Sequence, residues 1–105
     1  MPLTRDFKST VKARAERDPE FRIGLLQEAV AAFIHGETDL GKVLLRDYVN
    51  ATVGFEELAE TLGKTPKSLM RMLSSSGNPR SDNLFAIIAH LQANEGISFE
   101  VVAGK

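Results

Sequence analysis

Apolar side chains recur every three or four residues along most of this chain, which is the spacing of helices that bury one face. The first such stripe is weak, because Phe7 and Val11 stand almost alone in the polar, basic stretch 4–17. The next helix has a clear start, with Asp18 as its expected N-cap and Pro19 at its first position. Its apolar stripe, which ends before Gly36, consists of Leu26, Ala29, Val30 and Phe33.

One longer and two shorter helices are expected in the middle of the chain. The longer helix runs from about Thr38 to Ala51. A short helix follows at 55–62, and another begins after Thr65, its expected N-cap, with Pro66 at the first position. The residues expected to face the core are Leu40, Leu44 and Tyr48 in the first of these helices, Phe55, Leu58, Ala59 and Leu62 in the second, and Leu69, Met72 and Leu73 in the third.

The serines, glycine and proline of "SSSGNPR" predict a loop over 74–80. After this loop, Ser81 is expected to cap a last helix that stops at Gly96. The apolar stripe of that helix is Leu84, Ile87, Ile88 and Leu91.

The C-terminal tail changes period, since Ile97, Phe99 and Val101 alternate with polar residues as in a half-buried strand. A strand needs an edge to pair with, in this chain, in a second subunit or in a partner's sheet. A frayed terminus is the alternative. The expected fold is therefore all-α, with an N-terminal helical extension at 1–17, one helical domain at 18–96, and a short C-terminal β-strand and tail at 97–105.

Composition narrows the class of protein. The chain has 105 residues, of which 43% are apolar, enough for one small domain with a modest core. No run approaches the ~20 apolar residues of a membrane span, and no signal peptide is expected at the N-terminus. The absence of cysteine excludes disulfides, thiol nucleophiles and thiolate metal sites. A cytoplasmic protein is the default expectation.

The net charge of −1 argues against a protein that coats nucleic acid without specificity. The charges are segregated, however. Cations gather in residues 1–17, where Asp6 and Glu16 also occur. They gather again in residues 63–81, where no acid occurs. The acids concentrate between Asp18 and Glu60. Either one basic face or an ordinary solvated surface would give this distribution.

Gly63-Lys64-Thr65 has the ending of a phosphate-binding P-loop, but the rest of that motif is missing. Leu58 stands where the first glycine is needed, in an amphipathic helix instead of a loop after a strand. His35 and His90 are far apart in sequence and belong to no metal-binding motif, and His35 is better explained by its place at a helix end. Serines occur without a GxSxG motif. No enzyme and no cofactor is expected.

A helix-turn-helix explains the same stretch. Two short helices that cross tightly need a small residue at their contact, which Ala59 supplies, and a turn residue free to take positive φ, which Gly63 supplies. Proline at 66 pre-sets the entry into the second helix. A generic helical hairpin could carry the same pattern.

The outer side of the helix at 65–74 carries Lys67, Arg71 and Ser74, with Met70 at the edge. In a recognition helix Arg71 would pair with guanine, and Lys67 would contact a base or a phosphate. An ordinary solvated face is the alternative, and Ser81 is at least as well explained as a cap. The candidate DNA-binding residues are Thr65, Lys67, Ser68, Met70, Arg71, Ser74, Asn78, Arg80 and Ser81.

At this point the chain resembles a known family over about residues 18–101. "DPEFRIGLLQEAVAAFIHGE", "GFEELAETLGKTPKSLMRMLSSSGNPRSDN" and "ISFEV" are similar to addiction-module antidote proteins, which are Xre/lambda-repressor-like regulators of bacteria. The resemblance implies a five-helix fold and a homodimer on a palindromic operator in double-stranded DNA. It also implies repression of its own promoter, a location at the nucleoid when DNA-bound, and a RelE/HigB-like toxin as partner.

Two departures limit what the resemblance implies. Lys64 occupies a turn position that many such motifs fill with an aliphatic residue, and the extension 1–17 is compatible with a solitary regulator that has no toxin. A protein-interaction module is a further alternative, since the acidic stretch 37–60 suits a partner with a basic surface. Replacing Lys67 and Arg71 by alanine distinguishes the two functions. If these residues read DNA, the change abolishes specific binding and leaves the fold intact.

Overall fold

The computed structural model describes residues 5–104, with side chains from Ser9 onward. Within these residues the chain forms helices α1 (Arg5–Arg17), α2 (Pro19–Ile34), α3 (Thr38–Ala51), α4 (Phe55–Leu62), α5 (Pro66–Met72) and α6 (Ser81–Glu95). The expected all-α class is confirmed. The expected packing of Phe7 lies outside the described side chains.

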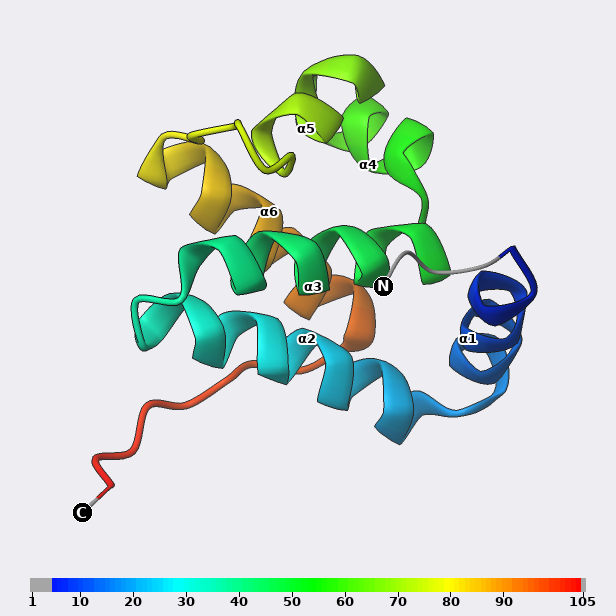
Figure 1. The fold of residues 1–105 in the computed structure, drawn as a ribbon. Coiled ribbons are helices and arrows are strands. Elements are labelled where there is room, and N and C mark those ends of the chain that lie inside the picture. The colour runs from blue at the N-terminus through cyan, green and yellow to red at the C-terminus, as the bar shows by residue number, and fades with distance from the viewer. Residues whose placement is uncertain (1–4, 105) are drawn as a thin grey trace.

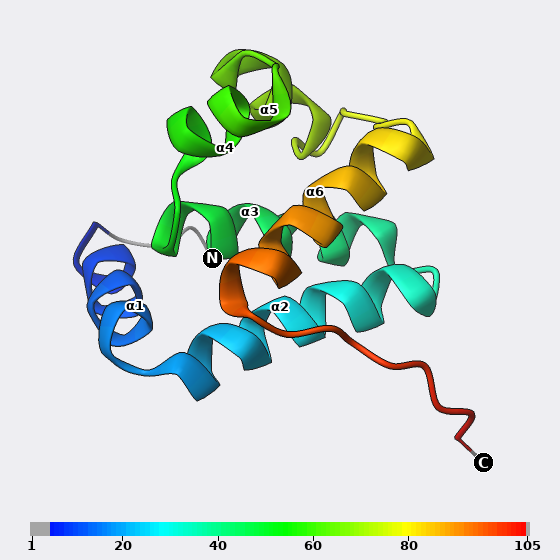
Figure 2. The same cartoon turned by 180° about the vertical axis from the view of Figure 1, so that it is seen from behind.

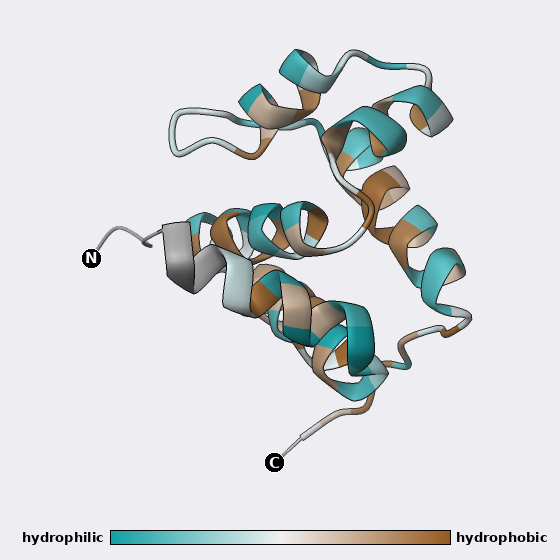
Figure 3. Cartoon of the chain, turned by 90° about the vertical axis from the view of Figure 1, so that its right-hand side faces the viewer, coloured by the Kyte–Doolittle hydropathy of each residue, from teal (hydrophilic) through white to brown (hydrophobic). Residues whose placement is uncertain are grey.

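Helix α3 lies in the middle of the molecule (Figure 1), with α2 antiparallel to it on one side and the short helices α4 and α5 on the other. Helix α6 crosses behind α3, as the view from the back shows (Figure 2). Brown and teal stretches alternate along the helices in Figure 3, as expected for helices that each bury one face.

Local capping sets two of the helix starts as expected. The Asp18 carboxylate accepts a hydrogen bond from the N–H of Phe21 at 3.2 Å. The hydroxyl of Thr65 accepts one from the N–H of Ser68 at 3.1 Å. In both helices proline follows at the first position.

The expected cap of α6 is wrong by one residue. The carbonyl of Arg80 accepts the first bond of the helix, from Leu84 N–H at 3.0 Å, so Ser81 lies one residue inside the helix instead of capping it. The Asp82 carboxylate accepts a hydrogen bond from the N–H of Asn83 at 2.9 Å, so it satisfies one of the N–H groups in the first turn of α6. Gly96 ends α6 in the left-handed conformation, as expected.

The core joins five helices, and it shifts the buried face of α3. Leu45, Tyr48 and Val49 of α3 are buried in it, whereas Leu40, which was expected to be inward, is 47% exposed. The reason is the close approach of α2: a Cβ at Gly41 would lie 2.8 Å from the ring of Phe33. Gly41 thus defines the side on which α2 packs.

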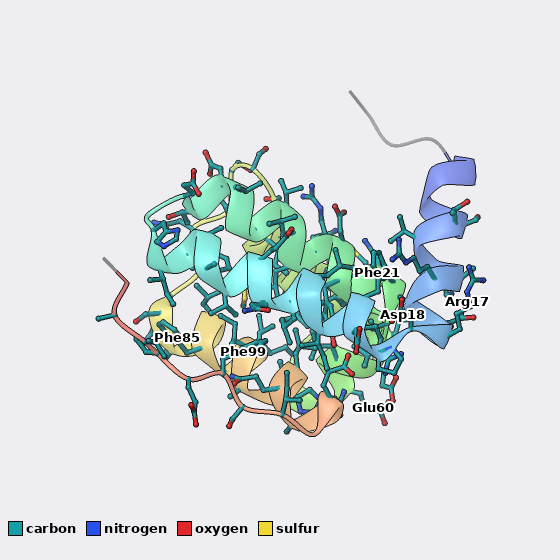
Figure 4. All side chains as sticks on the ribbon, turned by 90° about the horizontal axis from the view of Figure 1, so that it is seen from below. Arg17, Asp18, Phe21, Glu60, Phe85 and Phe99 are labelled. Carbon is teal, nitrogen blue, oxygen red and sulfur yellow. The ribbon has the colours of Figure 1, made fainter. Side chains whose placement is uncertain are left out.

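The expected C-terminal strand is not confirmed, since residues 97–104 form no strand and residues 5–96 offer no strand with which they could pair. Phe99 instead packs against the core and its N–H donates to the Gln92 side chain at 2.8 Å. Val101 is 88% exposed. Phe99 therefore anchors the tail to the helices, and the segment runs along one side of the molecule (Figure 4).

The first helix packs on the rest of the fold. Ala15 is fully buried, and α1 contacts both α2 and α3. At the junction with α2 the guanidinium of Arg14 lies 4.5 Å from the centre of the Phe21 ring and its Nε is 3.7 Å from the Asp18 carboxylate. Figure 4 shows Asp18 and Phe21 close together beside α1.

Candidate nucleic-acid interface

The junction of α4 with α5 is shaped by local backbone chemistry. Gly63 takes φ 67° and ψ 34°, in the left-handed region, and the N–H of Lys64 binds the carbonyl of Ala59 at 2.9 Å. The N–H of Gly63 binds the carbonyl of Glu60 at 3.3 Å. These paired bonds are a Schellman ending, which satisfies carbonyls that the helix leaves open. The expectation that Gly63 has positive φ is confirmed.

The inner faces of the two helices are buried as their patterns predict. Leu58 and Ala59 of α4 contribute to the core, as do Leu69 and the residue after α5, Leu73. Ala59 is 1% exposed, so no larger residue would fit at this place without moving its neighbours. The P-loop is excluded geometrically as well, since Leu58 is fully buried in a helix.

The outer side of α5 is exposed and basic. Lys67, Met70 and Arg71 are exposed. Among residues 5–104 neither Lys67 nor Arg71 has an ion pair or a side-chain hydrogen bond that would hold its charge. Their charges are therefore available to an anionic partner, while the helix itself is held by its buried face.

The loop from Leu73 to Arg80 is held by two cations of α3. Lys42 is only 4% exposed, and its Nζ donates to the carbonyl of Gly77 at 2.7 Å. Nη1 of Arg46 donates to the carbonyl of Leu73 at 3.2 Å, at the end of α5. These bonds link α3 to the segment that follows the candidate recognition helix.

Gly77 lies directly on the end of α5. A Cβ at this position would be 2.0 Å from the carbonyl oxygen of Arg71, so no side chain fits without moving the loop. The hydroxyl of Ser74 donates to the same Arg71 oxygen at 2.8 Å, and the Gly77 N–H binds the carbonyl of Ser74 at 3.0 Å. The loop is thus compact, and the Ser74 proton is already used within it.

The other candidate residues divide by exposure. Thr65, Asn78, Arg80 and Ser81 are exposed, and Ser68 is half-buried like Ser74. Arg80 forms an ion pair with Asp82, Nε to Oδ1 at 3.4 Å, in which both side chains are largely exposed. Such a surface pair is worth only about 0.2–1 kcal/mol and opens easily. The structure brings α5 and the loop residues Ser76–Asn78 together around one open depression of about 350 Å³.

Sequence reasoning missed Lys42, Arg46 and Asp82. Lys42 and Arg46 are spaced to share one side of α3, but nothing local indicates that this side meets the loop after α5. Asp82 lies just beyond the acid-free stretch and puts one negative charge beside Arg80.

Residues 5–104 contain no group of three histidine or acidic side chains that could hold a metal ion. None of the described helices is long and apolar enough to cross a membrane. No protein-family model, curated protein or solved structure matches this chain.

Proposed function

We propose that the chain is a sequence-specific DNA-binding transcriptional regulator in which α4 and α5 act as a helix-turn-helix. The observation that carries this proposal is the outer side of α5: exposed Lys67 and Arg71, without ion pairs to the side chains that the structure describes, on a helix whose opposite side is buried. In the major groove, Arg71 would donate to a guanine edge, and Lys67 to a base or a phosphate.

A single α5 of seven residues reaches few bases, so useful specificity requires two half-sites. The proposed state is therefore a homodimer on a palindromic operator. By the family resemblance, the proposed role is that of an autorepressor and antitoxin of a toxin-antitoxin module, within the five-helix lambda-repressor-like fold, in the bacterial cytoplasm. A regulator without a toxin would use the same DNA contacts.

A second candidate, protein binding without specific DNA reading, has one observation in its favour. Around the start of α3 the apolar side chains of Leu40 and Val43 are exposed next to the exposed acids Glu37 and Asp39. This surface would suit a partner with a basic surface, such as the toxin that the family resemblance implies.

The deciding experiment is fluorescence anisotropy with the DNA upstream of the coding sequence, compared with a scrambled duplex, over a salt series. We expect selective binding with a salt slope of about −0.9 for each phosphate contacted. Replacing Lys67 and Arg71 together by alanine should remove the selectivity and leave the circular dichroism spectrum and thermal unfolding unchanged, because both side chains lie outside the core.

The matched control is the double variant Lys12→Ala, Arg17→Ala on α1, which removes the same charge from exposed positions of another helix. An equal loss of binding in both double variants would show a general electrostatic effect. It would mean that α5 is not the helix that recognises the DNA sequence. Equal, weak binding of the wild-type protein to both duplexes would favour the protein-binding candidate.

A further inference from the structure

Lys42 is a buried cation whose partners are chiefly backbone oxygens of the loop after α5. Its Nζ lies 2.7 Å from the carbonyl oxygen of Gly77 and 3.5 Å from that of Ser75. The third partner is the Asp39 carboxylate at 3.5 Å, which is itself almost fully exposed. A buried ammonium needs such partners, because it has lost its water. The shortest contact of the Lys42 ammonium is therefore the one to the loop, at the Gly77 carbonyl, and its carboxylate partner Asp39 lies in water.

These bonds determine where the loop's N–H groups point. In a trans peptide the C=O and the following N–H point in opposite directions, and the described chain has no cis peptide. Because the Gly77 carbonyl points inward to Lys42, the N–H of Asn78 points outward. The same relation turns the N–H of Ser76 outward. Neither N–H makes a hydrogen bond within the described residues.

The two residues that carry these N–H groups border the depression beside α5. Ser76 and Asn78 line it, and Arg71 lines it from the helix side. The N–H of Gly77, between them, is used within the loop by the Ser74 carbonyl, so two unbonded N–H groups and the cation of Arg71 are offered to an anion there. The depression is open, so a phosphate carried on a long polymer can reach it.

We propose that Lys42 is a positioning residue of the DNA-binding surface. By holding the Gly77 and Ser75 carbonyls it turns the N–H groups of Asn78 and Ser76 toward a backbone phosphate of the operator, next to Arg71. Lys42 does not touch the DNA, because it is buried. This proposal rests on the proposed function and adds to it the residue that orients the loop.

The test is the variant Lys42→Met, which replaces the side chain by an apolar one only one atom shorter and removes its ammonium. Its affinity for the operator duplex should fall about tenfold, comparable to losing one hydrogen bond to a charged group. The salt slope should stay close to that of the wild type, because the lost contacts come from neutral N–H groups and the slope counts phosphates neutralised by cations. In NMR spectra of the wild-type protein the amide signals of Ser76 and Asn78 should shift on adding the duplex, and in the variant they should not.

The matched control is Lys42→Met with Asp39→Asn, which restores the wild-type net charge. It should behave like Lys42→Met alone; full recovery of affinity would mean that only the overall charge matters and would overturn the proposal. Should Lys42→Met fail to fold, the wild-type NMR spectra still test the proposal: amide signals of Ser76 and Asn78 that do not shift on adding the operator duplex would overturn it.

The outcomes separate the two proposals. Selective binding by the wild type, together with unchanged affinity and unchanged amide shifts in the folded Lys42→Met variants, overturns the role of Lys42 and leaves the proposed function standing. A wild-type protein that does not distinguish the operator from the scrambled duplex overturns the proposed function, and the role of Lys42 falls with it.

Discussion

The side chain of Tyr48 shows how one residue responds to its surroundings in the core. It is 1% exposed, and its hydroxyl donates a short hydrogen bond to the carboxylate of Glu95. Burial, and then this bond and the negative charge of Glu95, raise the pKa of Tyr48 well above its usual value. The folded protein therefore keeps the Tyr48 proton at a pH where the unfolded chain releases it.

This raised pKa predicts a loss of stability in alkali. The contribution of Tyr48 is complete below the ordinary tyrosine pKa of about 10 and declines as pH rises above it, since the unfolded state then binds fewer protons. In urea unfolding above that pH, the free energy of unfolding should fall more steeply for the wild type than for Tyr48→Phe.

The ultraviolet absorbance of tyrosinate gives a direct check of this prediction, because Tyr48 is the only tyrosine and the chain has no tryptophan. We expect the absorbance to rise only together with unfolding. A rise near pH 10 in a protein that is still fully helical would contradict the proposed cause.

At the scale of elements, two glycines predict opposite effects of the same substitution. Gly63 ends α4 with φ 67°, where an alanine would cost about 1 kcal/mol. Gly24 lies within α2, and an added Cβ would meet nothing within 4 Å. Gly63→Ala should therefore destabilise the protein, and Gly24→Ala should stabilise it by about 0.5–1 kcal/mol.

Thermal unfolding of the two variants, measured side by side, checks the sign of each change. A stabilising Gly63→Ala would mean that the turn between α4 and α5 does not need the left-handed conformation. Because Gly63 also sets the direction of α5, the same variant should weaken the proposed selective binding to the operator, whereas Gly24→Ala should not.

At the scale of the whole molecule, one carboxylate connects four helices. Glu95 of α6 accepts from Nε of Arg22 in α2 at 3.1 and 3.2 Å, and from Tyr48 of α3. Arg22 in turn donates to the carbonyl of Ala15 in α1 at 2.6 Å. The Glu95 side chain is 8% exposed, so this network lies largely out of water. The network connects the first and last described helices, α1 and α6, to α2 and α3.

Removing the charge of Glu95 should accordingly destabilise the whole fold. We expect Glu95→Gln to lower the free energy of unfolding by about 3 kcal/mol, because Arg22 then loses its carboxylate partner in a partly buried position. Urea unfolding measures this change. Asp82→Asn, which breaks the exposed pair with Arg80, is the control and should change stability by less than about 1 kcal/mol. Similar values for the two variants would contradict the structural role of Glu95.

Much of the helical architecture could be predicted from the sequence, because it depends on local chemistry. Asp18 and Thr65 cap the helices that follow them, and Gly63 and Gly96 end helices in the left-handed conformation. These effects act over a few residues and can be recognised in a short stretch. The exposed, basic outer side of α5 follows in the same way from helical spacing, once its opposite side is buried.

What the sequence by itself determined is therefore the set of helices and the chemistry of each face. Only the tertiary structure decided which faces meet: Lys42 reaches the carbonyl of Gly77, Arg46 that of Leu73, and Arg22 the carboxylate of Glu95. It also decided that residues 97–104 form no strand within the described chain, which offers no strand for them to pair with. The physical reason is common to all of these. A contact between residues distant in sequence depends on how whole helices pack, and no local pattern encodes that distance.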